Sequence, residues 1–229
     1  CTLSFDLIGH SRSGSPPEID HYRMDNAVDD LVSAVRSMGF EKAVWLGYSL
    51  GGRTALQVWK RHPDIVSGLI LEGASPGIPN CKERNLRRQS DESLAQLLIE
   101  DGIEAFVGHW ESLSLWKSQE INLSESSQTA LRAQRLAQRE VGLANSLRGM
   151  GTGAQSWLGE DLKSIKVPVL LIAGSLDDKY SQIAREMGEQ IPDSQIELIA
   201  DAGHAAHIEK PEQVHKVIKE FLLKQRRNL

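Results

Sequence analysis

The sequence is poor in the features that hold small secreted folds together or that bind polyanions and membranes. Its 229 residues include only two cysteines, Cys1 and Cys81, which excludes a disulfide framework and favours a reducing, cytoplasmic setting. The 31 acidic residues outnumber the 26 basic ones, and the net charge of −5 argues against nucleic-acid binding, which generally needs a basic face. The longest dense apolar run, residues 167–173, is far shorter than the roughly 20 residues of a membrane-spanning helix. We therefore expect a globular protein with neither nucleic acid nor membrane as a partner.

An initiator methionine and a secretory leader are also missing from the start of the sequence. The chain opens at Cys1 and passes directly into a strand-like run over residues 2–8. No charged segment followed by an apolar one precedes that run, so no signal peptide is visible. We expect that the sequence begins inside a fold, as a fragment whose first strands lie upstream of Cys1.

The residues that are present show strands alternating with helices. Short apolar runs rich in β-branched residues alternate with amphipathic helical patterns, which is typical of a parallel sheet covered by helices on both faces. The predicted strands are residues 2–8, 42–48, 66–72, 167–173 and 194–199. The predicted helices outside the middle of the chain are residues 24–38, 50–61, 181–190 and 211–224.

The middle of the chain interrupts this alternation. Residues 76–160 contain helical patterns and no convincing strand, and Leu94, Leu97 and Leu98 share one face of a helix that Ser90 or Asp91 could cap. A helical insertion in a parallel sheet is typical of a cap over the carboxyl ends of the strands, where ligands bind. We predict a core of residues 1–75 and 161–229 and a helical cap of residues 76–160. An idle insertion is the alternative.

A G-x-S-x-G motif centred on Ser49 follows one predicted strand directly and precedes a predicted helix. In that context the serine occupies a sharp, strained turn that lifts its hydroxyl above the edge of the sheet. We expect glycine at Gly47 and Gly51 because side chains there would collide with the neighbouring backbone. A glycine-rich turn that only packs helix on strand is the alternative.

A serine hydroxyl needs a histidine to accept its proton and a carboxylate to orient that histidine. In this kind of fold the acid and then the histidine follow later strands. Asp177 follows the predicted strand 167–173, and His204 follows the strand 194–199. Asp178 is an alternative acid. His207 is an alternative base, although its place before a helix start suits a capping or surface role better.

The order and context of these residues resemble the α/β-hydrolase superfamily over the whole chain. Asp6-Leu7-Ile8-Gly9-His10-Ser11-Arg12-Ser13 is similar to the D-x-x-G-H-G-x-S stretch after that superfamily's fourth strand, with Ser11 in place of glycine. The resemblance implies a mostly parallel sheet flanked by helices, with a helical cap and without its first strands. The H-G-[FG] oxyanion loop would then lie upstream, which leaves the backbone N–H of Leu50 as the oxyanion donor within this sequence.

Further segments narrow the resemblance to one branch of that superfamily. Tyr48 precedes the serine and Arg53 follows it. Residues 72–78 are similar to the branch's strand-to-cap junction, residues 83–91 to its Arg-rich cap helix, and residues 106–110 and 115–116 to its aromatic cap segment. The branch is the 2-succinyl-6-hydroxy-2,4-cyclohexadiene-1-carboxylate synthases of menaquinone (vitamin K2) biosynthesis. The resemblance implies substrate contacts from Tyr48, Arg53, Arg87, Trp110 and Arg135.

The substrate of that branch carries three carboxylates, so the resemblance implies a small polycarboxylate ligand in a cationic pocket. Residues 82–88 and residues 132–148 each contain four basic residues and one acidic residue in an otherwise acidic chain. Arginine suits such a ligand because its fork donates two parallel hydrogen bonds to a carboxylate. The alternatives are that these arginines form the solvated faces of cap helices and that Trp110 only packs.

Together these features predict a lyase on an α/β-hydrolase scaffold. Ser49, activated by His204 and Asp177, would remove an acidic C–H proton beside a carbonyl, and pyruvate would be eliminated. An esterase or thioesterase that uses the same triad covalently is the second hypothesis, and a non-catalytic or inactive fragment is the third. The sequence has neither the ligand spacing of a metal site nor a phosphate-binding glycine loop, so we expect no metal and no organic cofactor.

Overall fold

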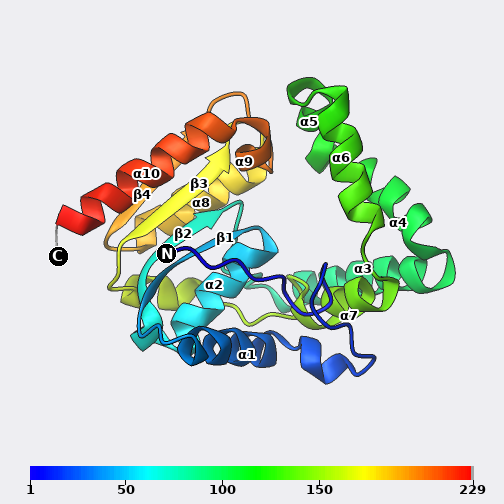
Figure 1. Ribbon diagram of the computed structural model, residues 1–229, viewed down its shortest axis with the longest axis horizontal. Coiled ribbons are helices and arrows are strands. Elements are labelled where there is room, and N and C mark those ends of the chain that lie inside the picture. Colours follow the sequence, from blue (N-terminus) through cyan, green and yellow to red (C-terminus); the bar gives the residue numbers. More distant parts are fainter. Residues whose placement is uncertain (228–229) are drawn as a thin grey trace. The chain divides into compact units, whose positions relative to one another are not determined.

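The strands lie in one of two compact units into which the structure divides the chain. The computed structural model describes residues 1–227 (Figure 1). The first unit, here called the sheet unit, consists of Phe40–Pro76, Ser114–Leu123 and the chain from Leu158 onward. The second, here called the helical unit, consists of Cys1–Gly39, Gly77–Leu113 and Ser124–Trp157. Ser49, Asp177 and His204 all belong to the sheet unit.

The sheet confirms the predicted α/β class. Within residues 1–227 it has four parallel strands in the order β1-β2-β3-β4. The strands are β1 (Ala43–Tyr48), β2 (Val66–Glu72), β3 (Val169–Gly174) and β4 (Ser194–Ile199). The other elements of the sheet unit are α2 (Leu50–Arg61), η2 (Pro63–Ile65), η3 (Ser114–Trp116), α5 (Lys117–Asn122), η4 (Gly159–Ser164), α8 (Asp178–Gln190), α9 (Ala206–Glu209) and α10 (Pro211–Arg227). Because all strands run the same way, their carboxyl ends meet at one edge, where Ser49, Asp177 and His204 follow β1, β3 and β4.

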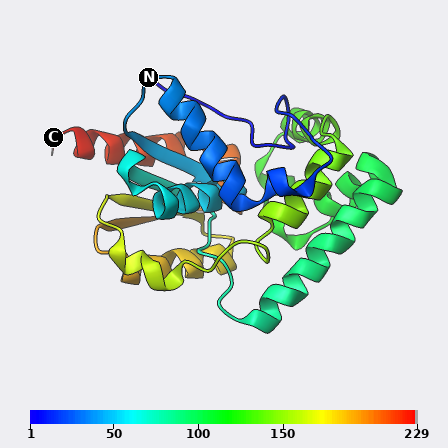
Figure 2. The ribbon, with the colours of Figure 1, turned by 90° about the horizontal axis from the view of Figure 1, so that it is seen from below.

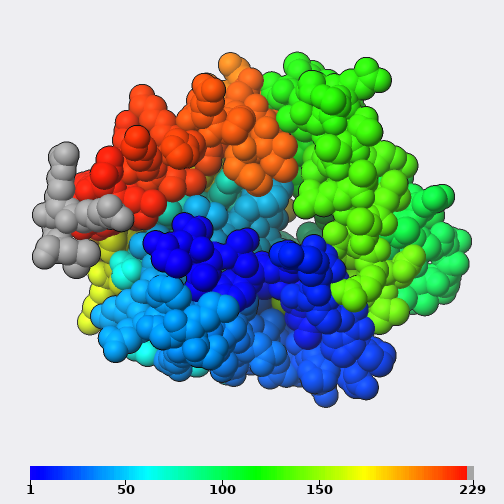
Figure 3. Space-filling model, viewed as in Figure 1, coloured from blue at the N-terminus to red at the C-terminus, as the bar shows by residue number. Residues whose placement is uncertain are grey.

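Helices cover both faces of this sheet because successive side chains of a strand point to opposite sides. On one face Ile70 and Ile172 join a buried cluster with Phe221 of α10. On the other face Gly188 of α8 lies against Leu171. Figure 2 shows α10 and α8 on opposite sides of the strands. In Figure 3, α10 (red) and the chain that leads to it from β4 (orange) form a continuous surface. Because both faces of the sheet are covered, β2 and β3 have nearly continuous apolar sequences.

The expected strand over residues 2–8 is wrong. Within residues 1–227 this run pairs with no strand, and an isolated strand has nothing to satisfy its backbone groups. Asp6 instead holds a local turn: its carbonyl oxygen accepts from Ser13 Oγ at 2.6 Å, and its carboxylate accepts from the Arg12 backbone N–H at 3.3 Å. The residue types of this run favour a strand, but a strand also needs a neighbouring strand to pair with, and none of those described over residues 1–227 pairs with it.

The helical unit packs its own helices around a separate core. They are η1 (Ile19–Tyr22), α1 (Met24–Ser37), α3 (Cys81–Glu100), α4 (Gly102–Glu111), α6 (Glu125–Leu136) and α7 (Glu140–Met150). Leu98 of α3 and Phe106 of α4 belong to one buried cluster. Asn80 caps α3, its side chain accepting from the first-turn N–H groups, so Ser90 and Asp91 lie inside the helix rather than at its start. None of the helices described over residues 1–227 is both long and apolar enough to cross a bilayer.

Candidate active site

Ser49 occupies the strained turn that the sequence predicts between β1 and α2. Its backbone has φ 49° and ψ −107°, a left-handed conformation that is unfavourable for a residue with a side chain. Its N–H donates to the carbonyl oxygen of Glu72 at 2.8 Å, which ties the turn to the end of β2. The neighbouring strand therefore holds the serine in this conformation.

The structure confirms the expected crowding at one glycine of the motif and contradicts it at the other. A Cβ on Gly47 would collide with the backbone of Gly51 and Gly52, as expected. A Cβ on Gly51, however, would meet no atom within 4 Å. The crowded second position is Gly52, where a Cβ would lie 2.6 Å from Ala74 Cβ and 2.9 Å from the carbonyl oxygen of Gly47. Close packing of α2 on the chain after β2 thus requires Gly52, which the motif does not include.

His204 connects Ser49 with Asp177. Its Nδ1 atom lies 2.7 Å from Asp177 Oδ2, and its Nε2 atom lies 3.1 Å from Ser49 Oγ. A carboxylate only accepts, so the pair assigns the proton to Nδ1 and leaves Nε2 to accept from the serine hydroxyl. Asp177 is 8% exposed and His204 3% exposed, so water has little access to either. Such a chain of groups can take a proton from the serine and make its oxygen a nucleophile or a base.

Aromatic rings surround His204. The ring centroids of Tyr48, Trp116 and Tyr180 lie 5.3, 5.7 and 4.5 Å from the imidazole centroid. Tyr180 also belongs to the turn that holds the acid, because its N–H donates to Asp177 Oδ1 at the start of α8. These rings restrict the orientation of the imidazole, and sequence reasoning did not predict Tyr180 as a neighbour of the histidine.

The two alternative residues lie outside the hydrogen-bonded chain. Asp178 is exposed at the start of α8. The backbone N–H and Nδ1 of His207 both lie within hydrogen-bonding distance of Glu72 Oε1, at 3.0 and 2.9 Å, and its ring is 4.7 Å from that of Tyr48. The side chain of His207 is 39% exposed, which agrees with a surface position, but the residue lies inside α9 rather than at its cap. The buried carboxylate of Glu72 orients it beside Tyr48.

Leu50, the predicted oxyanion donor, begins α2 directly after Ser49. The first N–H groups of a helix have no partner within the helix and carry its positive end, so an anion near Ser49 would be favoured there. Arg53 follows one turn later and is 8% exposed. The roles of Leu50 and Arg53 stay predictions.

The other residues predicted to contact the substrate belong to the helical unit. Each of them pairs with, or stacks on, another side chain of that unit. Arg87 Nε donates to Asp91, four residues along α3, at 2.9 Å. Arg135 of α6 donates to Glu111 at 2.8 Å. Trp110 stacks on the Phe106 ring with centroids 5.6 Å apart. Asp91 and Glu111 lie outside the basic segments 82–88 and 132–148. The charge balance of those segments therefore did not reveal them.

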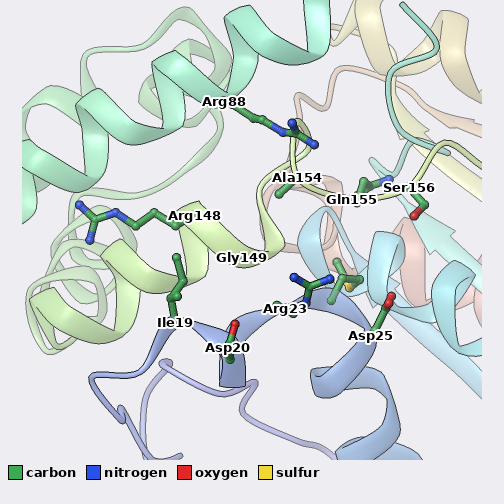
Figure 4. Close-up of a pocket in the computed structure, with 11 residues that line it drawn as sticks. Ile19, Asp20, Arg23, Asp25, Arg88, Arg148, Gly149, Ala154, Gln155 and Ser156 are labelled. Carbon is green, nitrogen blue, oxygen red and sulfur yellow. The ribbon is translucent and has the colours of Figure 1, made fainter. Parts of the chain in front are cut away.

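Other arginines of the same two segments line a pocket of about 360 Å³ in the helical unit, which sequence reasoning did not predict. Figure 4 shows Arg88 and Arg23 on opposite sides of it, with Asp20 and Asp25 nearby. Arg148 reaches the wall of this pocket but forms two hydrogen bonds with Glu92, at 2.8 and 2.7 Å. These bonds hold the pKa of the Glu92 carboxyl below its ordinary value. In the part of the chain described, residues 1–227, no cluster of three or more histidine, cysteine or acidic side chains has the arrangement of a metal site.

Comparison with known proteins places the chain in a family. The family model described as the alpha/beta hydrolase fold matches residues 1–211. The chain belongs to this family, and it is an enzyme built on that fold. A Bacillus subtilis protein, whose name provisionally assigns it to the 2-succinyl-6-hydroxy-2,4-cyclohexadiene-1-carboxylate synthases, is 39% identical over 96% of this chain and 80% of its own. A synthase of that name from Serratia proteamaculans is 26% identical over 97% of this chain and 83% of its own.

Two solved structures are similar over nearly the whole chain. The structure of MenH from S. aureus superimposes with a TM-score of 0.91, at 37% identity over 97% of this chain and 83% of the other. A malate-bound esterase from Thermogutta terrifontis has a TM-score of 0.83 at 25% identity, over 96% of this chain and 78% of the other. The first likeness is closer in both sequence and backbone.

Proposed function

We propose that this enzyme is a carbon–oxygen lyase of menaquinone biosynthesis. It eliminates pyruvate from 2-succinyl-5-enolpyruvyl-6-hydroxy-3-cyclohexene-1-carboxylate and forms 2-succinyl-6-hydroxy-2,4-cyclohexadiene-1-carboxylate. The observation on which the proposal chiefly rests is the 39% identity to the Bacillus subtilis protein across 96% of the chain. The hydrogen-bonded chain from Asp177 through His204 to Ser49 supplies the chemistry that such an elimination needs.

In the proposed mechanism Ser49 acts as a base. Its hydroxyl proton passes to His204 Nε2, and the oxygen then removes the C–H proton that the adjacent carbonyl makes acidic. The electrons of that C–H bond form a new double bond in the ring, the existing ring double bond shifts by one position, and the C–O bond to the enolpyruvyl group breaks. The imidazolium, held by Asp177, can return its proton to the departing enolpyruvate, which becomes pyruvate. An acyl-enzyme is not formed, because no acyl carbon is attacked.

Charge develops on the carbonyl oxygen when the C–H proton leaves. The N–H of Leu50, at the positive end of α2, is the proposed donor to that oxygen. Arg53, Arg87 and Arg135 are the proposed partners of the substrate carboxylates, and Tyr48 and Trp110 the proposed apolar contacts. Since Arg87 and Arg135 already pair with Asp91 and Glu111, the substrate would share these arginines with the resident acids.

A hydrolase that uses the same three residues covalently is the second candidate. The likeness to the Thermogutta terrifontis esterase favours it, because esterases employ a serine, a histidine and an acid in this arrangement. In that mechanism Ser49 Oγ would bond to the acyl carbon of an ester, and water would release the acid. The lower identity and lower TM-score weigh against this candidate.

One pair of assays separates the two functions. Pyruvate release from the enolpyruvyl substrate, coupled to lactate dehydrogenase, is compared with hydrolysis of p-nitrophenyl esters by the same preparation. We expect fast pyruvate release, slow ester hydrolysis, and a loss of several orders of magnitude in pyruvate release for Ser49→Ala, as for other serine triads. Efficient ester hydrolysis without pyruvate release would replace the lyase by the hydrolase.

A further inference from the structure

We propose that Glu209 is a positioning residue whose buried carboxylate fixes the loop that carries His204. Its Oε2 atom accepts hydrogen bonds from the Gly203 backbone N–H and from Asn122 Nδ2, both at 2.8 Å. Its Oε1 atom accepts one from Ser118 Oγ at 3.0 Å. Gly203 directly precedes His204, so one of these bonds acts on the residue next to the imidazole.

The burial of Glu209 shows that these bonds matter to the fold around the histidine. The residue is 5% exposed, and a carboxylate removed from water is strongly unfavourable unless hydrogen-bond donors replace the water. Its three donors come from the loop before His204 and from the segment Ser114–Leu123, which is distant in sequence. The carboxylate therefore joins two segments that are distant in sequence.

The same hydrogen-bond network includes Asp201, the strained residue of the loop. Asn122 Nδ2, besides donating to Glu209, donates to the carbonyl oxygen of Asp201 at 2.7 Å. Asp201 has φ 57°, a left-handed conformation that persists only when the surroundings hold it. The side chains of Asn122 and Glu209 thus fix the loop at Asp201 and again at Gly203. A change at either point would move His204 Nε2 relative to Ser49 Oγ.

The network also positions one wall of the imidazole site. Ser118 and Asn122 lie on α5, immediately after Trp116, whose ring meets the His204 ring nearly edge-on with centroids 5.7 Å apart. Gly203 fits beneath Ser118 only because it lacks a side chain; a Cβ there would collide with the Ser118 side chain. Glu209 therefore sets both the backbone position of the histidine and the ring packed against it.

The inference rests on the proposed role of His204 as the base for Ser49 and not on the identity of the substrate. Glu209→Ala removes all three acceptor contacts. Glu209→Gln removes the charge but keeps an oxygen that can accept from Gly203 and Asn122, while its amide can donate to the Ser118 hydroxyl. Positioning therefore predicts a defect in the alanine variant that glutamine restores.

The first test measures the rate at which a fluorophosphonate probe labels the intact protein. In this reaction Ser49 Oγ bonds to phosphorus, fluoride leaves, and the serine proton passes to His204, so the rate reports how well the pair is assembled. We expect Glu209→Ala to slow labelling by about 10- to 100-fold, as misplacement by about 1 Å can do, and Glu209→Gln to restore most of the rate. Asn122→Ala should give an intermediate loss.

The matched control is Asn145→Ala in the helical unit. Asn145 is 6% exposed and donates to the Pro17 carbonyl oxygen at 3.1 Å, so this variant also loses a buried polar side chain but lies outside the proposed site. Its labelling rate should equal that of the wild type, which separates positioning from lost stability. Wild-type labelling in both Glu209→Ala and Asn122→Ala overturns the proposal, as does a glutamine variant as slow as the alanine one.

A second readout does not depend on serine reactivity. The proton between His204 Nδ1 and Asp177 gives a downfield proton NMR resonance, which we expect to be retained in Glu209→Gln and lost or broadened in Glu209→Ala and Asn122→Ala. If the wild type neither releases pyruvate nor takes up the probe, the proposed function fails while this resonance still tests Glu209. An unchanged resonance in Asn122→Ala decides against positioning even if Glu209→Ala does not fold.

Discussion

His204 Nε2 lies 3.1 Å from Ser49 Oγ, although the two residues are 155 positions apart in the sequence. The serine is held by the turn between β1 and α2, and the histidine by the loop after β4. β1 and β4 are separated by β2 and β3 in one sheet, so the distance between the serine and the histidine depends on that sheet.

Replacing the acid should impair catalysis without unfolding the protein. Asp177→Asn keeps a good cap for α8, where Oδ1 accepts from the Tyr180 N–H. Its amide, however, can present a donor to Nδ1 and so favour the wrong imidazole tautomer. We expect kcat for pyruvate release to fall by about 10⁴-fold, the magnitude of such a change in a serine protease triad. The control is Asp178→Asn, one residue along and exposed, which should keep the wild-type kcat. Equal losses in both variants would remove Asp177 from the triad.

The two glycines after Ser49 should respond oppositely to alanine. Gly51→Ala places its methyl group in open space and should raise stability by up to about 1 kcal/mol, because alanine favours a helix more than glycine does. Gly52→Ala brings a methyl group to 2.6 Å from Ala74 Cβ and should lower stability by about 1–3 kcal/mol through overpacking. Thermal unfolding followed by circular dichroism measures both. A destabilised Gly51→Ala protein with a stable Gly52→Ala protein would contradict the packing of α2.

Arg135 and Arg132 offer a matched pair, because both pair with Glu111. Arg135 is 19% exposed and Arg132 is 47% exposed at the side chain. If only Arg135 binds a substrate carboxylate, Arg135→Ala should lower kcat/KM for pyruvate release by roughly 10- to 100-fold, the loss of one charge-assisted hydrogen bond. Arg135→Lys should lose nearly as much, since a point charge cannot replace the fork.

Arg132→Ala is the control for this experiment and should leave kcat/KM almost unchanged. If the three variants and the wild type have similar kcat/KM values, Arg135 pairs with Glu111 and does not bind the substrate. The same comparison applies to Arg87, with Arg87→Ala expected to behave as Arg135→Ala does.

The ion pair between Arg148 and Glu92 should make a small, pH-dependent contribution to stability. The arginine lowers the pKa of the Glu92 carboxyl in the folded protein from the ordinary 4.5, so the contribution is complete above that pH and is lost as the pH falls through the lowered value. Both side chains are partly exposed, and less than about 1 kcal/mol is expected. Urea unfolding at pH 7 and at pH 3 should show a smaller difference for Glu92→Gln than for the wild type. An identical difference in both proteins would mean that the pair does not contribute.

Local patterns in the sequence predicted those parts of the fold that depend on near neighbours. The bounds of β2 and β4 agree with the runs at residues 66–72 and 194–199. β2 is almost wholly buried and largely apolar, as expected for a central parallel strand, whereas β4 is partly buried and mixes apolar with polar residues. The same reasoning failed for residues 2–8, because a strand also needs a partner to accept its hydrogen bonds. It also failed for Gly51, because crowding depends on what packs above a glycine and not on the glycine's place in a motif.

The sequence by itself determined the strand–turn–helix around Ser49 and the order of Asp177 and His204, since each follows from residues within one turn or strand end. Only the tertiary structure decided that His204 meets Ser49 while His207 meets Glu72, that Glu111 faces Arg135, and that Glu209 joins the histidine loop to α5. These are contacts between segments whose separation along the chain says nothing about their separation in space. Distances of about 3 Å between such segments are set by the packing of the whole unit, because hydrogen bonds weaken steeply when donor and acceptor are displaced.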